Sequence, residues 1–135
     1  MSLLAPLFSL FLPFLVWPVE YFFPYPFIVE EIAKGVLIYF VATSREKIDK
    51  IKMVAAIGVL FAFSETVLYL FNIYLVGNIS TLLQRLMLTT SLHVITSLII
   101  YLPAIRNKKY IVLGVVLAGV LHYFFNFYIG KVLLL

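Results

Sequence analysis

The chain has 135 residues, of which 64% are hydrophobic and only 12% charged, and its mean hydropathy is +1.14. A soluble domain is about 45–50% apolar and about 25% charged, so this composition excludes a soluble globular protein as well as a disordered or collagen-like one. The sequence contains no cysteine, which excludes disulfides, Cys-ligated zinc, iron–sulfur clusters and thiol catalysis. At about 20 residues per membrane span, the length suits one domain of several spans.

Five apolar segments predict transmembrane helices at about residues 2–17, 27–42, 53–76, 82–102 and 110–130. Between the first two, residues 18–26 are rich in proline and aromatic residues. This composition predicts a turn at the membrane interface, with Trp17, Tyr21 and Tyr25 at headgroup depth. We therefore expect an all-α polytopic membrane protein that forms a single transmembrane domain over residues 1–135.

The net charge of +4 is concentrated in two clusters between apolar segments. These clusters hold seven of the ten basic residues: Arg45, Lys47, Lys50 and Lys52 in one, and Arg106, Lys108 and Lys109 in the other. Basic loops next to membrane spans mark the cytoplasmic side. With five spans both loops lie on that side, which predicts a cytoplasmic N-terminus and a C-terminus outside the cell membrane. The same placement argues against a nucleic-acid partner.

Apart from Arg85 near the start of the fourth span, six ionisable residues fall inside the predicted spans: Glu30, Glu31, Lys34, Glu65, His93 and His122. Each costs about 2.5–3.5 kcal/mol at mid-span, so together they cost on the order of 15 kcal/mol unless they are paired. They must therefore face one another, water or a ligand. Their depths agree in the middle to outer leaflet, which predicts a polar site buried between the last four helices.

The spacing along each helix supports a common site. Asn126 lies four residues after His122, and Ser97 lies four residues after His93, so each pair shares a helix face. Lys34 can reach the carboxylate of either preceding glutamate. Arg85, near the start of the fourth span, is expected to extend toward the interface, and it is kept with Lys34 and Ser97 as a supporting residue.

This set of residues could hydrolyse a peptide bond. A carboxylate with a neutral imidazole can activate water, and a second imidazole with an asparagine amide can donate hydrogen bonds to an oxyanion. The sequence lacks HExxH and paired ExxH spacings, so we expect no metal and no other cofactor. Three alternatives stay open: a divalent metal held by the same Glu and His residues, a small proton or ion transporter, and a non-catalytic protein that acts by binding.

Four motifs follow one another on successive predicted helices: EExxK from Glu30, FxxxE ending at Glu65, HxxxS from His93 and HxxxN from His122. In this order they resemble the PrsW family of intramembrane proteases, which is related to the type II CAAX prenyl endopeptidases and the wider CPBP group. The resemblance covers about residues 27–130. It implies an endopeptidase that cleaves a membrane-associated protein substrate in the lipid bilayer.

The resemblance also implies roles for single residues. Glu30 would supply the water-activating carboxylate with Glu31 in support, and His122 and Asn126 would donate to the oxyanion. Glu65 stands where CAAX enzymes have His, and this difference favours the PrsW family. It also implies that Glu65 or His93 is the residue that assists the catalytic base. PrsW members often end in HxxxD, so Asn126 is closer to the CAAX pattern.

Overall fold

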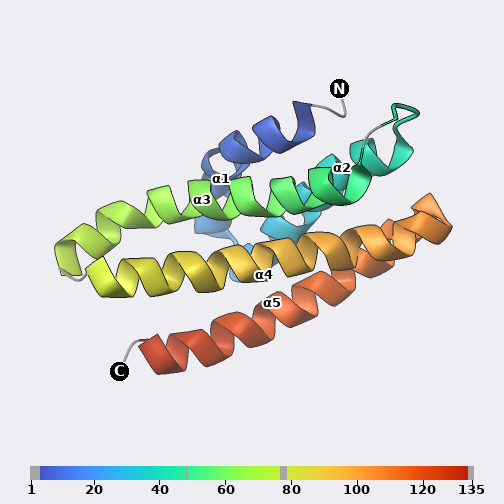
Figure 1. Cartoon of the computed structure of the whole chain (residues 1–135). Helices are drawn as coiled ribbons and strands as arrows, with labels where there is room; N and C mark the ends of the chain where they lie inside the picture. The colour runs from blue at the N-terminus through green and yellow to red at the C-terminus, as the bar shows by residue number, and fades with distance from the viewer. Residues whose placement is uncertain (1–3, 48, 77–78, 134–135) are drawn as a thin grey trace.

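The computed structural model describes residues 4–47, 49–76 and 79–133, with side chains at 69, 71–76, 79, 81 and 130–133 left undescribed. Within these ranges the chain is helical and contains no strand, which confirms the all-α prediction. The elements in chain order are α1 (Ala5–Phe22), α2 (Pro26–Thr43), α3 (Lys50–Val76), α4 (Ile79–Arg106), the short 3₁₀ helix η2 (Lys108–Tyr110) and α5 (Ile111–Leu133) (Figure 1).

In the described part of the chain, four segments are long and apolar enough to cross a membrane: Ala5–Phe22, Lys50–Leu68, Leu82–Arg106 and Lys108–Ile129. The fifth helix, α2, has the length of a span but carries Glu30, Glu31 and Lys34 within its 18 residues. All three of these side chains are buried inside the bundle. The charges of α2 therefore face protein rather than lipid, as the cost of a charge in hydrocarbon requires.

Helix α1 is longer than the sequence predicts. It continues through Pro13 and Pro18 and ends at Phe22, so only residues 23–25 connect it to α2. A proline removes one backbone hydrogen bond, but apolar surroundings offer the neighbouring peptide groups no water as an alternative partner, so the helix persists. Glu20, which the sequence placed in an interfacial turn, therefore lies in the last helical turns of α1.

The two basic loops lie at the same end of the bundle, as predicted (Figure 1). At this end the ammonium of Lys50 donates to the carbonyls of Ala42 and Ser44, at 3.1 and 2.9 Å. A cation at these carbonyls neutralises the negative end of the α2 dipole. At the other connection, the side-chain oxygen of Asn107 accepts the N–H of Lys109 at 3.0 Å and so begins η2.

Two glycines let α4 pack closely between α3 and α5. A Cβ atom on Gly58 of α3 would lie 2.6 Å from the carbonyl oxygen of His93. A Cβ atom on Gly114 of α5 would lie 2.6 Å from the Cα of Ile100. Small residues at helix contacts are the usual means of close packing in membranes. The backbone of α4 therefore packs directly against the backbones of α3 and α5, and this close packing fixes the position of His93.

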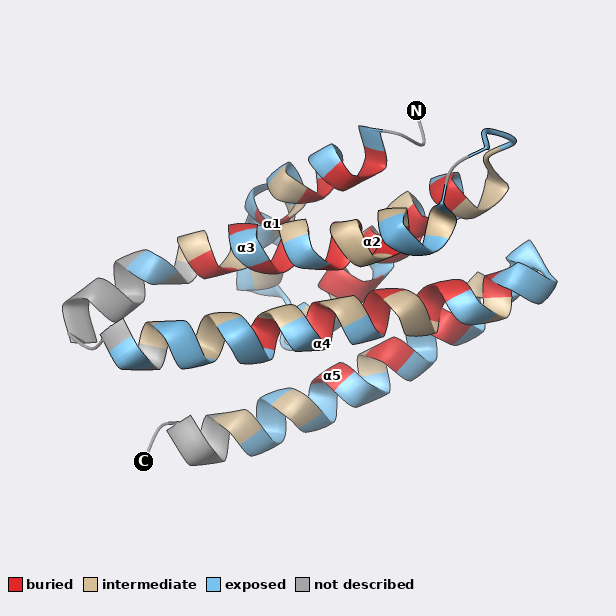
Figure 2. Ribbon diagram, viewed as in Figure 1, coloured by how far each residue is buried: buried red, intermediate tan, exposed pale blue. Residues whose placement is uncertain are grey.

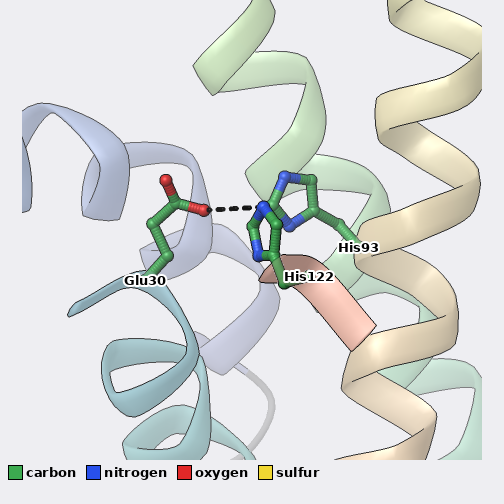
Figure 3. Close-up of side chains that lie close together, drawn as sticks. All are labelled: Glu30, His93 and His122. Atoms are coloured by element: carbon green, nitrogen blue, oxygen red, sulfur yellow. Dashed lines mark ion pairs between the residues drawn. The ribbon is translucent and has the colours of Figure 1, made fainter. Parts of the chain in front are cut away.

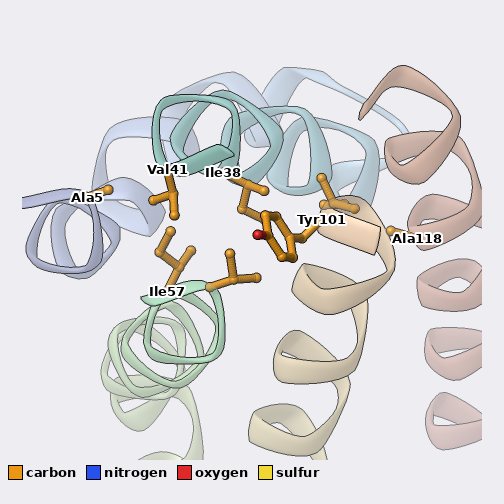
Figure 4. Close-up of a cluster of buried hydrophobic side chains, with 8 residues drawn as sticks. Ala5, Ile38, Val41, Ile57, Tyr101 and Ala118 are labelled. Atoms are coloured by element: carbon orange, nitrogen blue, oxygen red, sulfur yellow. The ribbon is translucent and has the colours of Figure 1, made fainter. Parts of the chain in front are cut away.

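The interior has two layers. The apolar layer is next to the basic loops, and it consists of Ala5, Ile38, Val41, Val54, Ile57, Ile100, Tyr101 and Ala118 (Figure 4). Each of α2 to α5 then continues from this layer into residues with polar side chains, at Lys34, Ser64, His93 and His122. The second, polar layer is therefore farther from the basic loops, and it holds the candidate site.

Most of the outer surface is apolar. Buried residues lie on the helix sides that face the bundle, while the outward sides of α3, α4 and α5 are exposed (Figure 2). Only 17% of the apolar span in α5 and 22% of that in α1 are buried. Exposed apolar side chains of this extent fit contact with lipid tails, in agreement with a multi-pass membrane protein.

Candidate active site

Polar side chains from four helices meet in the second layer. The buried ionisable residues among them are Glu30 (7% exposed), Glu31 (1%), Lys34 (0%), His93 (0%) and His122 (3%). The carboxylate of Glu30 and the two imidazoles point toward one another (Figure 3). Glu65 of α3 joins them through a contact with His93. The structure therefore brings together all six of the ionisable residues that the sequence placed inside the spans.

Lys34 is the central donor of this layer. Its ammonium donates to Oε1 of Glu31 at 2.7 Å, to Nδ1 of His93 at 2.9 Å and to Oγ1 of Thr96 at 2.8 Å. An ammonium has three N–H groups, so all of its donors are used. Thr96 was not anticipated from the sequence, and it completes the ring of acceptors. Because removing a charge from water is costly, a buried ammonium needs hydrogen bonds of this number to offset its lost hydration.

The contact with Lys34 fixes the tautomer of His93. Because an ammonium can only donate, Nδ1 of His93 accepts, and the proton of the neutral imidazole lies on Nε2. That Nε2–H donates to Oε2 of Glu65 at 2.5 Å. Both nitrogens of His93 are therefore used in hydrogen bonds within the protein.

His122 has the opposite arrangement. Its Nδ1 lies 2.7 Å from Oε1 of Glu31, which accepts from it. In the neutral imidazole Nε2 then carries a lone pair, and it lies 3.7 Å from Oε2 of Glu30. That oxygen of Glu30 accepts no hydrogen bond from any residue that the structure describes. The free nitrogen of His122 and the free oxygen of Glu30 therefore face each other.

A small cavity opens beside Glu30, between α1, α2 and α3. It is lined by Pro13, Trp17, Glu20, Glu30, Phe61, Glu65 and Leu68. Its volume of about 40 Å³ has room for about three water molecules, since one water needs at least about 10–15 Å³. Glu20 was missed as a site residue because the sequence placed it in a turn. It is the only charged residue among residues 1–29, and that isolation in an apolar helix is the signal that could have found it.

The site carries more acid than base. Its carboxylates are those of Glu20, Glu30, Glu31 and Glu65, and the cations whose charge acts on them are Lys34 and Arg85. With both imidazoles neutral, the carboxylates outnumber these cations by two. A surplus of this kind in a buried layer requires water, protons or a bound cation.

A family model described as "PrsW family intramembrane metalloprotease" matches residues 7–135, nearly the whole chain. The chain belongs to the PrsW family. The match confirms the resemblance seen in the motifs and extends it over α1, which the motifs do not cover. Comparison with curated proteins and comparison with solved structures each found no match.

The description of the PrsW family as metalloproteases weighs against our expectation of a site without metal. Glu30, His93 and His122 each offer a ligand atom, and these atoms lie within 4.8 Å of one another. Two imidazoles and a carboxylate suit Zn²⁺, Mn²⁺ or Fe²⁺. The free oxygen of Glu30 fits this role, and so does His122, because a metal-bound histidine usually donates its other N–H to a carboxylate. His93 would first have to release Lys34 or Glu65.

The remaining predicted residues lie around the cluster. Asn126 is one turn beyond His122, but its side chain is exposed on α5. Ser97 is fully buried one turn from His93, and its hydroxyl has no hydrogen-bond partner among the described residues. Arg85 is partly buried near the beginning of α4. The charge of Arg85 acts on Glu65.

Proposed function

We propose that this PrsW-family member is an intramembrane endopeptidase that hydrolyses a peptide bond of a membrane-associated protein. The observation that carries the proposal is the free Oε2 of Glu30. This oxygen is buried, lacks a donor among the described residues and faces Nε2 of His122, and Glu30 also lines a cavity of water size. A carboxylate oxygen placed in this way can accept a proton from water as that water attacks a carbonyl.

Glu31 has a supporting role in this scheme. It accepts hydrogen bonds from both Lys34 and His122 through the same oxygen. It therefore holds the imidazole of His122 with its second nitrogen directed toward Glu30 and the cavity. Adjacent glutamates on α2 thus have different tasks, because Glu31 is held through Oε1 by Lys34 and His122, whereas Oε2 of Glu30 has no donor among the described residues.

His122 and Asn126 are the proposed donors to the oxyanion that forms when water adds to the carbonyl. For His122 this role needs the protonated imidazole, whose second N–H points toward Glu30 and the cavity. Glu30 and Glu31 both lie within ion-pair distance of that imidazolium. Asn126 is exposed one turn further along α5, so a substrate segment lying along α5 would contact Asn126 and lie one helical turn from the buried His122.

A metal-assisted version rests on the donor set and on the family description. Glu30, His93 and His122 would hold a divalent metal, which supplies Lewis acidity and a more acidic bound water when present. In this version Glu30 is a ligand, and Glu65, next to His93, is the carboxylate left to accept a proton. The two versions share every residue but assign the proton acceptor differently.

The proposed substrate is a protein with a single membrane span. The site lies among helices whose outer sides are apolar, so a substrate reaches it most directly through the lipid. The cavity lies between α1 and α3, which marks these two helices as one boundary of the approach route.

The test is cleavage of single-span membrane peptides by purified protein in liposomes, with and without a chelator. We expect wild type and the control Glu46→Gln, which changes a loop carboxylate, to cleave at equal rates. Glu30→Gln and His122→Ala should each lose at least about a hundredfold in rate, the usual size of an acid–base contribution. Cleavage that persists in both site variants would refute the proposal. Sensitivity of the wild type to the chelator decides between the two versions.

A further inference from the structure

The cavity beside the site contains a carboxylate that belongs to none of the four sequence motifs. Glu20 reaches it from α1, while Glu30 comes from α2 and Glu65 from α3. Oε1 of Glu20 is buried and accepts no hydrogen bond from the described residues, as is also true of Oε2 of Glu30. Two of the residues that line this small space therefore each carry a carboxylate oxygen that no described donor satisfies.

The size of the cavity restricts what can fill it. A volume of about 40 Å³ is far below the pockets of about 300–1,000 Å³ that hold small molecules, and it equals the space of about three waters. Water is also the donor that the carboxylates lack. A buried water makes about three hydrogen bonds, and three carboxylates around the cavity supply the acceptors.

We propose that this cavity stores water for the reaction and that Glu20 is the residue that positions it. The place of this water in catalysis rests on the proposed function, whereas the occupancy of the cavity does not. Water bound to Glu20 lies in the cavity that Glu30 also lines, so it is held where the carboxylate of Glu30 can take its proton. Glu20 acts through this water and does not touch the substrate, so it is a positioning residue.

The apolar part of the lining makes Glu20 necessary. Pro13 and Trp17 of α1 and Phe61 and Leu68 of α3 offer water no hydrogen bonds through their side chains, apart from the indole N–H. A cavity with apolar walls alone stays dry. Without the carboxylate of Glu20, the α1 side of the cavity would offer water only the indole N–H of Trp17, and Glu30 and Glu65 on the other side would be the acceptors left.

The occupancy is tested by brief radiolytic labelling of the protein in lipid nanodiscs, in which hydroxyl radicals formed from bound water oxidise adjacent side chains. Leu68 lines the cavity, and Leu98, its matched control, is also partly buried but packs against the apolar core. We expect oxidation of Leu68 to exceed that of Leu98 at least fivefold in wild type. In Glu20→Leu the two leucines should react equally, whereas Glu20→Gln should keep most of the labelling of Leu68. Equal labelling of both leucines in wild type would overturn the proposal.

The cleavage assay then tests the link to the reaction. Glu20→Leu should lower kcat about tenfold, as expected for one lost hydrogen bond to the reacting water, and Glu20→Gln should restore most of it. The control Val19→Leu changes a neighbouring exposed side chain and should cleave like wild type. If Leu68 is no longer labelled in Glu20→Leu but kcat is unchanged, the water of the cavity does not serve the reaction, and this role of Glu20 is disproved. If wild type cleaves nothing, the proposed function fails, and the labelling experiment still decides whether the cavity holds water.

Discussion

The ammonium of Lys34 and the imidazole of His93 lie 2.9 Å apart, Nζ to Nδ1, and neither side chain is exposed at all. This contact joins α2 to α4 and determines which nitrogen of His93 carries a proton. Lys34 of the EExxK motif thus determines the tautomer of His93 in the HxxxS motif, and the two motifs depend on each other.

Replacing Lys34 should unfold the protein more readily. Lys34→Met leaves the carboxylate of Glu31 buried without its cation, and removal of one partner from a buried pair costs about 3–5 kcal/mol. We expect a clearly lower Tm for thermal unfolding in detergent. The double variant Lys34→Met with Glu31→Gln should recover most of the loss, because no unpaired charge is left. A double variant no more stable than the single one would contradict this explanation.

His93 and Glu65 should act as a unit in catalysis. Nε2 of His93 donates to Oε2 of Glu65 at 2.5 Å, and this is the hydrogen bond that joins Glu65 to the rest of the site. We expect His93→Leu, Glu65→Leu and the double variant to lose similar activity, each at least about a hundredfold. Rates of peptide cleavage complete the double-mutant cycle. Losses that multiply in the double variant would mean that the two residues work independently.

Gly58 should be intolerant of the smallest substitution. The added Cβ of Gly58→Ala would lie 2.6 Å from the carbonyl oxygen of His93, so α4 must move away from α3. Overpacking of this kind costs about 1–3 kcal/mol, and here it also displaces His93 from Glu65. Gly119→Ala is the matched control, since its Cβ would meet nothing within 4 Å. Unfolding and cleavage measured on both variants should change only for Gly58→Ala.

Metal binding can be measured without a substrate. If the metal-assisted version holds, Zn²⁺ or Mn²⁺ titrated into metal-free protein should bind at one site per chain. Glu30→Gln and His122→Ala should each weaken this binding about 10–100-fold or more, as loss of ligand-sphere groups does. Glu46→Gln should bind like wild type. Binding that is equal in all four proteins would place the metal elsewhere.

The predicted orientation can be tested because the chain has no cysteine of its own. Single cysteines introduced by Glu46→Cys and Asn107→Cys lie in the two basic loops. Both should resist a membrane-impermeant maleimide in intact cells and react after permeabilisation, since basic loops stay on the cytoplasmic side. Labelling of both loops in intact cells would reverse the predicted orientation, and labelling of one loop alone would contradict the five-span topology.

The sequence predicted the helices well because hydrocarbon leaves the backbone few options. Its errors came from the prolines. The sequence predicts that spans end just before Pro18 and Pro103, yet α1 and α4 continue through these prolines. The consequence for the site was larger than for the fold, because Glu20 lies just beyond Pro18. An isolated acid in an apolar segment is a stronger signal than a neighbouring proline when the segment is in a membrane.

The sequence also predicted which residues form the site, but it did not predict which of them pair with one another. The cost of charge in lipid indicated that the six ionisable residues would meet. Spacing alone allowed Lys34 to reach either Glu30 or Glu31, and the structure pairs it with Glu31. Helix periodicity placed Asn126 on the face of His122, yet of these two residues the structure buries only His122, because α5 leaves most of its side chains exposed. Which partner a side chain contacts depends on the distances between helices, and these distances cannot be predicted from residue spacing along the sequence.

The apolar layer below the site has a consequence for the membrane itself. Side chains such as Ile38, Ile57 and Ile100 are fully buried between the polar cluster and the basic loops. They close the hydrated interior on that side, because neither protons nor ions cross a dry layer of aliphatic side chains without a large desolvation cost. The protein can therefore keep water and charge deep in the bilayer and still leave the electrical insulation of the cell membrane intact.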